Sequence, residues 1–236
     1  MKSTKPGPLA AEELQNDELQ EEEEQESGLY GGFWTDYTIK MLIEGITPLM
    51  TNNPAGMLGK GGPWRSGKNI PTPAEAAEGS TYRRDDGGLG FPAAGVRKCL
   101  ITGATGASIG TRAASSVLSE SISHFPPLEG DELFPLEDLE GQALTNYEIN
   151  TRRGIRGKEG VPISRARVFP WRLRCQLKLT VPAEQDMETF KNGFFKVANK
   201  AGQYPGLGDG RPEKIKGKGL WFGKFKVVDL AISPLQ

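Results

Sequence analysis

The chain has 236 residues, with 29 lysines and arginines against 30 aspartates and glutamates and a single histidine, so its formal net charge is −1. At this length we expect one folded domain with appendages. No run of residues approaches the ~18 apolar residues of a membrane span, and no apolar stretch follows the first lysines as it does in a secretory signal. These observations predict a cytoplasmic protein with no membrane partner.

The charges are distributed unevenly along the sequence. Residues 1–28 hold nine acidic residues against Lys2 and Lys5, a net charge of −7. Such a segment has too few apolar side chains to offset its ordering entropy, so we expect an acidic disordered tail. Residues 29–236, with 27 basic and 21 acidic side chains, form the predicted folded domain. Either the tail competes with nucleic acid for a basic surface, or it only keeps the protein soluble.

The first part of the folded domain predicts short elements separated by long loops. Apolar side chains alternate with polar ones between Tyr37 and Ile43, which predicts a strand within residues 33–50. The elements expected after it are, in order, a Gly-, Pro- and Asn-rich loop at 51–72, a short helix within 73–82, a helix at 92–102, a flexible small-residue segment at 103–116, a short strand around Leu133 and a strand at 147–153.

The final third of the chain has the most regular pattern. A period of two predicts a strand at 168–181 with one core face and one open face. The core set is Trp171, Leu173, Cys175, Leu177 and Leu179, and the open set is Arg172, Arg174, Gln176, Lys178 and Thr180. An apolar stripe at helical spacing predicts a helix from Asp186 that ends at Gly202. A glycine loop at 202–219 then leads into a last strand at 220–230.

In order, these elements read strand, helix, strand, strand, helix, strand. A βαββαβ order resembles the ferredoxin-like plan, an α+β fold in which two helices cover one face of an antiparallel sheet. The long Gly-rich loops would be insertions into that plan. The second face of the sheet would be open, and folds of the RNA-recognition type bind bases on that face.

Two basic segments supply the candidate binding residues. Arginine makes planar bidentate contacts to phosphate and stacks on bases, and glycines let backbone N–H groups approach phosphates closely. A basic loop at 152–167 and the strand after it contribute Arg152, Arg153, Arg156, Arg165, Arg167, Arg172, Arg174 and Lys178. The glycine loop and the start of the last strand contribute Arg211, Lys214, Lys216 and Lys218 for phosphates, with Trp221 and Phe222 as stacking candidates. The alternative for both segments is a solvated, soluble surface.

The end of the chain carries a family resemblance. A helix, a glycine-rich loop and then Phe222-Gly223-Lys224-Phe225 look like the terminal signature of the RAMP superfamily, the ferredoxin-like CRISPR backbone and processing proteins. Over about residues 38–230 the chain also resembles a group of small phage-encoded proteins of unassigned role, through its segments 43–49, 91–94 and 208–212. The RAMP resemblance implies binding of RNA or another single strand, in the host cytoplasm if the protein is phage-encoded.

Several other patterns favour ordinary structural roles. Residues 62–69 follow the spacing of a phosphate-binding P-loop, but Asn69 replaces the hydroxyl that would hold Mg²⁺; residues 88–93 imitate a dinucleotide fingerprint without a preceding buried strand. His124 has no partners at metal-ligand spacing, so we expect no metal, no cofactor and no catalytic residue. Cys99 and Cys175 lie among apolar neighbours, which favours buried free thiols.

We therefore expect a non-enzymatic protein that binds RNA or single-stranded DNA through a basic sheet face and the glycine loop. Further partners would be other copies of the chain, assembled as a filament along the strand, or other subunits of a ribonucleoprotein complex. Two alternatives stay open. One is a structural or assembly component, of a virion or a multiprotein complex, whose basic face meets an acidic partner. The other is a RAMP-type ribonuclease with His124 as general base.

Overall fold

The computed structural model describes residues 34–55, 71–124, 132–156, 159–212 and 220–235. Within these ranges the protein is a mixed α+β fold with four helices and mostly antiparallel sheets. The main sheet has the strand order β11(Phe225–Pro234), β1(Trp34–Gly45), β10(Arg172–Pro182), β7(Leu133–Glu137) and β3(Gly90–Pro92), with β6(Ile122–His124) also paired to β10. Every pairing in this sheet is antiparallel. The predicted acidic tail at 1–28 lies outside the described residues.

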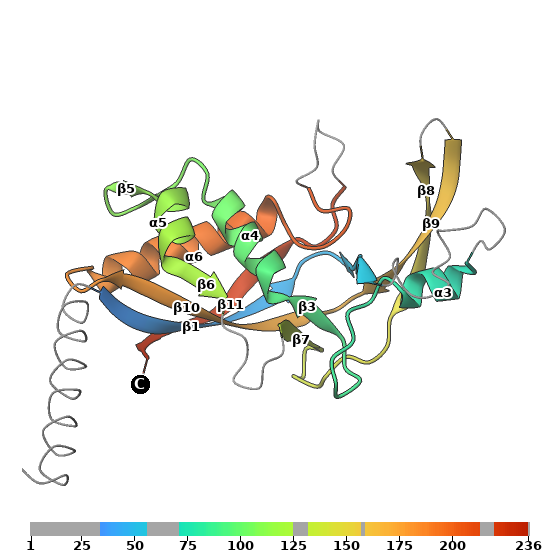
Figure 1. The fold of residues 1–236 in the computed structure, drawn as a ribbon, viewed down its shortest axis with the longest axis horizontal. Helices are drawn as coiled ribbons and strands as arrows, with labels where there is room; N and C mark the ends of the chain where they lie inside the picture. Colours follow the sequence, from blue (N-terminus) through green and yellow to red (C-terminus); the bar gives the residue numbers. More distant parts are fainter. Residues whose placement is uncertain (1–33, 56–70, 125–131, 157–158, 213–219, 236) are drawn as a thin grey trace, which may run out of the picture.

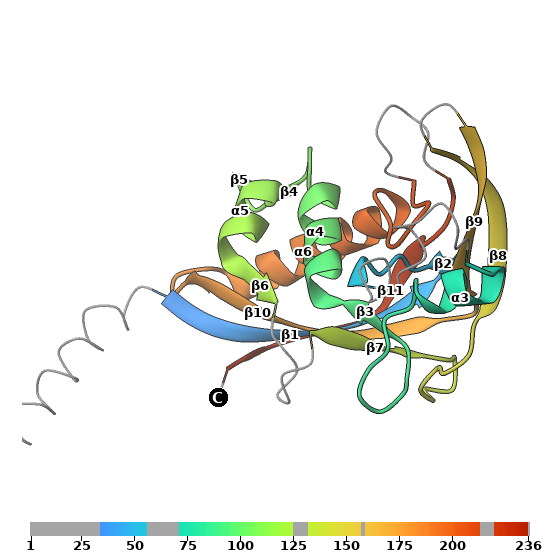
Figure 2. The same cartoon turned by 45° about the vertical axis from the view of Figure 1, so that its right-hand side comes forward.

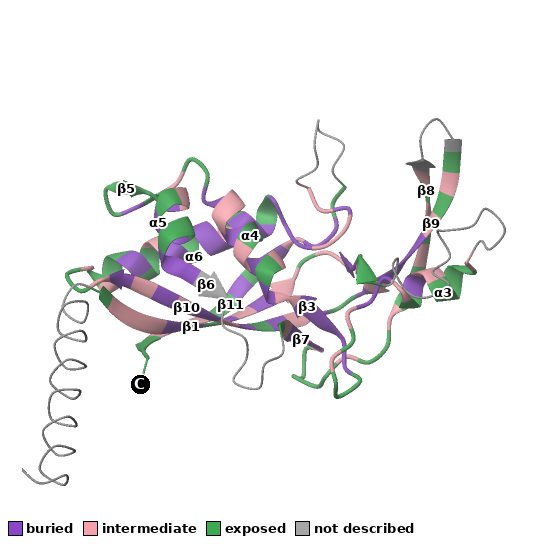
Figure 3. Cartoon of the chain, in the orientation of Figure 1, coloured by how far each residue is buried: buried purple, intermediate pink, exposed green. Residues whose placement is uncertain are grey.

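Three helices cover one face of the main sheet, and the other face carries no helix (Figures 1 and 2). They are α4(Ala93–Gly103), α5(Ala114–Ser121) and α6(Met187–Gln203). The buried residues gather between these helices and the sheet, as the purple band in Figure 3 shows. Its largest fully buried side chains include Trp171, Phe134, Phe190, Phe194 and Phe225. Each such side chain stabilises the fold by roughly 1.5–3 kcal/mol, which makes this layer the core.

The alternation predicted for strand 168–181 is confirmed. Trp171, Leu173, Cys175, Leu177 and Leu179 are all at most 1% exposed, and the cationic set lies on the helix-free face, here called the open sheet face. The strand begins at Arg172, with Trp171 just before it. Cys99 and Cys175 are free and buried, as expected.

The region predicted as a basic loop at 152–167 is instead a long hairpin, and that prediction was wrong. β8(Glu148–Arg156) and β9(Glu159–Val168) pair antiparallel from Glu148↔Arg167 to Arg156↔Glu159. This hairpin arm projects away from the main sheet, beside the short helix α3(Pro73–Glu78), and β2(Leu49–Met50) pairs with its base (Figures 1 and 2). Its arginines hid the strand signal because they occupy both faces of the ribbon.

The segment 103–116 is ordered rather than flexible, which corrects a second prediction. β4(Ser108–Ile109) and β5(Arg112–Ala113) form a tight hairpin that leads into α5. Small residues are needed here because α4 packs closely on α6, and a Cβ at Gly103 would lie 2.4 Å from that of Ala201. The small residues that suggested a flexible segment are thus explained, at Gly103, by the close packing of two helices.

Helix α6 confirms the predicted start but not the predicted end. Asp186 is its N-cap, and its carboxylate accepts a hydrogen bond from the Glu188 N–H at 3.1 Å. The helix continues through Gly202 to Gln203, so Gly202 is not a C-terminal glycine. A Cβ at Gly202 would lie 2.2 Å from the carbonyl oxygen of Phe225, which shows that the glycine allows helix and strand to approach.

The remaining boundaries differ by a few residues. The glycine loop runs from residue 204 to 224, since α6 ends at Gln203 and β11 begins at Phe225 rather than at residue 220. The helices expected at 73–82 and 92–102 span Pro73–Glu78 and Ala93–Gly103. His124, expected in a loop, ends β6 with its backbone opposite Leu177. Among the described helices none has the length and apolar character needed to cross a membrane.

Candidate nucleic-acid interface

The open sheet face presents the cations that the sequence predicted, but each of them meets a carboxylate of the same face. The Arg172 guanidinium donates two hydrogen bonds to one oxygen of Glu44, at 2.9 and 2.7 Å. Lys226 reaches the other oxygen of Glu44 at 2.9 Å. Hydrogen bonds from Lys226 and then from Arg172 lower the pKa of Glu44, so this carboxylate stays ionised between two cations.

Arg174 and Lys178 are paired in the same manner. Arg174 makes a bidentate contact with Glu137, with N···O distances of 3.1 and 3.0 Å. Lys178 lies 2.5 Å from a carboxylate oxygen of Asp36. Both carboxylates come from strands that neighbour β10 in the sheet, β7 and β1, and both are remote from it in the sequence.

The open sheet face is therefore close to electrically balanced. Directly opposite residues of antiparallel strands share a face, so the registers assign its charges. The described residues of this face carry five positive and four negative charges. The positive ones are Lys40, Arg172, Arg174, Lys178 and Lys226, and the negative ones are Asp36, Glu44, Glu137 and Asp229. A nearly neutral surface attracts a phosphate backbone weakly, because non-specific affinity depends on uncompensated cations.

A second group of predicted arginines has a different environment. Arg152 on β8 and Arg165 on β9 point to the same side of the hairpin arm and meet Asp209 of the glycine loop. Arg152 donates to one Asp209 oxygen at 2.6 Å, and the Nε of Arg165 lies 3.5 Å from the same oxygen. We call these three residues the Asp209 cluster. The cluster joins the hairpin arm to the glycine loop, and Arg152 and Asp209 are 57 residues apart in the sequence.

Arg165 of the Asp209 cluster is buried, Arg152 and Asp209 are partly buried, and not all guanidinium donors have hydrogen-bond partners. The Arg165 side chain is 9% exposed, and burial, followed by the nearby Arg152 charge, lowers the pKa of its guanidinium although Asp209 opposes the shift. Arg152 Nη1 and Arg165 Nε are buried without a hydrogen-bond partner. Two guanidinium groups thus share one carboxylate in a region of low dielectric.

The other arginines of the hairpin arm divide between pairing and exposure. Arg167 forms a short ion pair with Glu148, its opposite residue on β8. Arg153 is exposed, on the face of the arm opposite Arg152. The side chain of Arg156 lies outside the described residues, as do Lys214, Lys216 and Lys218 of the glycine loop. Arg211 donates to the Gly208 carbonyl at 3.2 Å.

In the described parts of the glycine loop, residues 204–212 and 220–224, several backbone N–H groups bind carbonyls of the protein itself. Leu207 N–H donates to the Gly223 carbonyl at 2.9 Å and Asp209 N–H to the Met50 carbonyl at 2.8 Å. Gly223 N–H donates to the Pro48 carbonyl at 2.8 Å. These bonds attach both branches of the loop to residues 48–50 at the end of β2.

Close approach explains why glycine occupies two of these positions. Gly223 has φ of +68°, and a Cβ there would lie 1.9 Å from the Leu207 carbonyl oxygen. Gly208 has φ of +74°, and a Cβ there would lie 2.2 Å from the Met50 carbonyl oxygen. No L side chain fits at these distances, so the glycines fix the path of the loop and thereby the position of Asp209.

The two aromatic candidates for base stacking, Trp221 and Phe222, differ in their exposure to solvent. Trp221 is 60% exposed, with its backbone carbonyl held by the Thr47 hydroxyl at 2.7 Å. Phe222 is 8% exposed and packs beneath the Trp221 ring, with the ring centroids 5.3 Å apart. Only Trp221 of this pair offers its face to a base, and Phe222 supports it from below.

A pocket of about 370 Å³ opens beside the Asp209 cluster, between α4 and the glycine loop. Its lining includes the aromatic rings of Tyr82 and Phe91, the cations Lys98 and Arg211, and Asp209 itself. Sequence reasoning missed both this pocket and the role of Asp209. The acidic residue stood inside the Gly208–Pro212 resemblance segment, but nothing in the sequence paired it with arginines on a distant hairpin.

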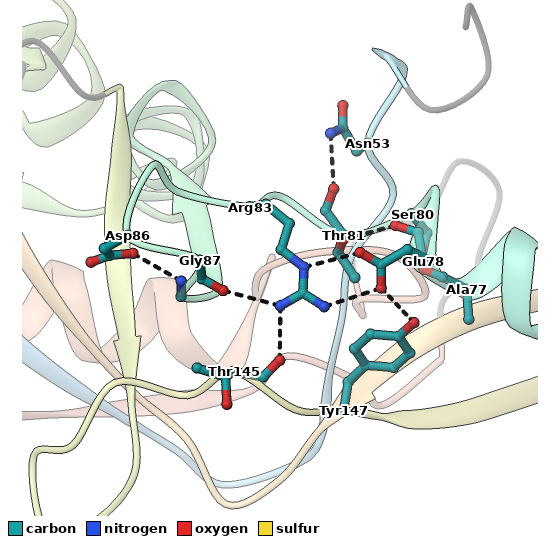
Figure 4. Close-up of polar contacts among 11 residues, drawn as sticks. Asn53, Ala77, Glu78, Ser80, Thr81, Arg83, Asp86, Gly87, Thr145 and Tyr147 are labelled. Atoms are coloured by element: carbon teal, nitrogen blue, oxygen red, sulfur yellow. Dashed lines mark hydrogen bonds and ion pairs between the residues drawn. The ribbon is translucent and has the colours of Figure 1, made fainter.

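A polar network holds the base of the hairpin arm against the main body (Figure 4). Arg83 donates to both Glu78 oxygens at 3.0 and 3.1 Å and to the carbonyls of Gly87 and Thr145 at 3.1 and 2.8 Å. The Tyr147 hydroxyl donates to Glu78 at 2.7 Å, just before β8 begins. Burial, followed by this hydrogen bond, raises the pKa of Tyr147 to about 12. The network ties α3 to the start of β8.

Among the described residues no three His, Cys, Asp or Glu side chains are grouped to hold a metal ion. No known protein-family model matches the chain, and a comparison with curated proteins finds no match. The resemblance to RAMP and phage-encoded proteins therefore stays a prediction.

Proposed function

We propose that the protein is a non-enzymatic binder of single-stranded nucleic acid, RNA or single-stranded DNA, and that the strand lies along the hairpin arm and the glycine loop. The single observation that carries the proposal is the Asp209 cluster, in which two arginines share one carboxylate. Arginine is suited to phosphate because its planar fork makes bidentate contacts, and the cluster keeps one positive charge beyond its internal pair.

Neighbouring groups support a strand at this location. Lys98 and Arg211 line the adjacent pocket, and Trp221 presents an exposed ring. A cationic track with a stacking platform is the general arrangement of sequence-tolerant single-strand binding. The contacts predicted from Arg172, Arg174 and Lys178 are not part of this proposed site, because each of these cations is paired with a carboxylate on the open sheet face.

We further propose that the core is ferredoxin-like. β1 and β6 are both antiparallel to β10 and so parallel to each other, with α4 and α5 in the connection between them. β10 and β11 are both antiparallel to β1, with α6 in their connection. Two interlocked split βαβ units of this kind make up the ferredoxin-like plan, and the hairpin arm is an insertion between β7 and β10.

The RAMP resemblance supports the same function, since it implies binding of RNA or another single strand, whereas the resemblance to phage-encoded proteins of unassigned role implies no activity. Under this proposal the protein acts in the cytoplasm, and several copies, or other subunits of a ribonucleoprotein complex, bind along one strand. An assembly component with an acidic protein partner and a ribonuclease are the alternatives that the experiment below separates.

The test is a titration of labelled single-stranded RNA, single-stranded DNA and duplex, followed by fluorescence anisotropy at 50 and 200 mM salt. About four phosphate contacts on a single strand predict a loss of affinity of about fifty-fold between these salt concentrations. Preference for duplex, or no binding at 50 mM salt, would contradict the proposal and favour the assembly role. Cleavage of the labelled RNA that disappears in His124→Ala would instead support the ribonuclease.

A further inference from the structure

The two arginines of the Asp209 cluster have more hydrogen-bonding capacity than their surroundings use. Arg152 gives one Nη to Asp209, and Arg165 gives one Nη to the carbonyl of Ser164 at 3.1 Å. Arg152 Nη1 and Arg165 Nε are fully buried and have no hydrogen-bond partner among the described residues, and the ion-pair contact of Arg165 Nε to Asp209 is a long one, at 3.5 Å. Unpaired buried donors on charged groups are costly, so each needs an explanation, and a bound anion that completes the site is one.

The charges in the cluster are also incomplete. Asp209 neutralises one of two guanidinium groups, and the Arg165 side chain is about nine-tenths buried. A buried cation without a counter-ion is unfavourable, whereas a second anionic group of suitable shape would neutralise it. The group that matches two convergent guanidinium forks is a tetrahedral oxyanion with several acceptor oxygens, which is phosphate.

We propose that Arg152 and Arg165 form a binding site for one phosphate group, and that the Asp209 carboxylate occupies this site while no phosphate is bound. The proposal rests on the proposed function for the source of that phosphate, a phosphodiester of the bound strand. Asp209 then acts as an internal competitor, and it sets the affinity threshold that a nucleic acid must exceed.

The glycine loop allows the exchange without unfolding. Asp209 N–H is held by the Met50 carbonyl at 2.8 Å, so the backbone stays in place while the side chain rotates about its Cα–Cβ bond. This rotation breaks the contacts of the carboxylate to Arg152, Arg165 and the Gly210 N–H. Once the carboxylate has left, both guanidinium groups open toward the strand.

Gly210 is fitted to the same site. A Cβ at Gly210 would lie 2.7 Å from Arg152 Nη1, and its φ is +70°. A glycine at this position lets the loop cover the Arg152 guanidinium closely without a side chain of its own.

The proposal predicts opposite effects for substitutions within one cluster. Asp209→Asn removes the internal anion and keeps the size of the side chain, so affinity for a single strand should rise about tenfold at 100 mM salt. The slope of log affinity against log salt should steepen by about 0.7, the value for one further phosphate contact on a single strand. Arg165→Gln should lower affinity about tenfold and flatten the slope by the same amount. Arg172→Gln on the open sheet face is the matched control. It should change the affinity by less than twofold and leave the salt slope unchanged.

A second readout tests the site without nucleic acid. The unfolding midpoint is measured in inorganic phosphate and in chloride of equal ionic strength, because a ligand that binds only the folded state raises the midpoint. Phosphate should stabilise the wild type, stabilise Asp209→Asn more strongly and leave Arg165→Gln unaffected. Comparison of this measurement with the oligonucleotide titration also separates free phosphate from a phosphodiester as the source of the bound group.

The outcomes separate the two proposals. A folded Asp209→Asn variant that binds the strand more weakly and gains nothing from phosphate would overturn the site and make Asp209 a positioning residue. Phosphate stabilisation without oligonucleotide binding would keep the site and refute the proposed function. If Asp209→Asn does not fold, the wild type and Arg165→Gln decide, since loss of phosphate stabilisation in Arg165→Gln is required.

Discussion

The open sheet face and the Asp209 cluster both contain the arginines that make the sequence look basic, yet they differ in how their charge is compensated. On the open sheet face Arg172, Arg174 and Lys178 each meet a carboxylate from a neighbouring strand. In the Asp209 cluster two arginines share one carboxylate. A count of cations along the chain therefore overestimates the uncompensated positive charge of the open sheet face. It underestimates the importance of the Asp209 cluster, where two arginines share one carboxylate.

The difference arises from geometry rather than from composition. A strand in the middle of a sheet has neighbours on both edges, and cross-strand pairs of opposite charge stabilise the sheet. β10 lies between β1 and β7, which supply Glu44 and Glu137. Among the described residues no further strand pairs with the hairpin arm beyond its base, and Arg152 and Arg165 of its inner face meet the glycine loop instead. Exposed ion pairs contribute little stability, about 0–1 kcal/mol each.

The largest expected effect tests whether the glycine loop fixes the Asp209 cluster. Gly223→Ala should lower the free energy of unfolding by about 3 kcal/mol, since it combines a left-handed φ with a Cβ 1.9 Å from the Leu207 carbonyl oxygen. Urea unfolding measures this. The control is Gly106→Ala, at φ of +72° with nothing within 4 Å of the added Cβ, which should cost about 1 kcal/mol. Equal losses in both variants would show that steric approach in the loop is unimportant.

A second substitution tests the stacking platform beside the cluster. Trp221→Ala should weaken single-strand binding by about 1–3 kcal/mol, roughly fivefold to over a hundredfold, with little change in stability, because the ring is 60% exposed. Fluorescence anisotropy gives the affinity. Phe169→Ala is the control, a ring 49% exposed beside the second, smaller pocket at the base of the arm. If Phe169→Ala matters more than Trp221→Ala, the strand lies on the other side of the hairpin arm.

How far the sequence reaches can be judged from particular elements. The period-two alternation of β10 and the cap at Asp186 were predicted correctly, because each depends on neighbours a few residues away. The strand predicted at 147–153 is present as the first part of β8, but the rest of the hairpin arm was mistaken for a loop, since its polar residues on both faces hide the strand period. The partners of the cations could not be predicted, because Glu44, Glu137 and Asp209 reach them only through sheet register and loop path.

A third prediction concerns the network that holds the hairpin arm at its base. Tyr147→Phe removes the hydrogen bond to Glu78 and should lower the free energy of unfolding by about 1 kcal/mol at pH 7. The pKa of Tyr147 is raised from 10.0 to about 12, so its contribution is complete below pH 10 and is lost as the pH rises through 12. The stability difference between wild type and variant should therefore shrink over that range in urea unfolding. A constant difference up to pH 12 would exclude the protonated hydroxyl as the cause.

The smallest expected effect is the most direct test of the comparison between the two surfaces. The double variant Arg172→Gln, Glu44→Gln removes one cation and its carboxylate from the open sheet face, so the net charge of that face is unchanged. Lys226, which also contacts Glu44, keeps its charge and becomes more available to an anion. We expect single-strand affinity within twofold of the wild type and an unchanged salt slope, because a balanced pair releases no counterions when a strand binds. A tenfold loss of affinity, or a slope flatter by about 0.7, would mean that Arg172 exchanges Glu44 for a phosphate. The bound strand would then cross the open sheet face, and the ion pairs of that face would be exchanged for contacts to phosphate.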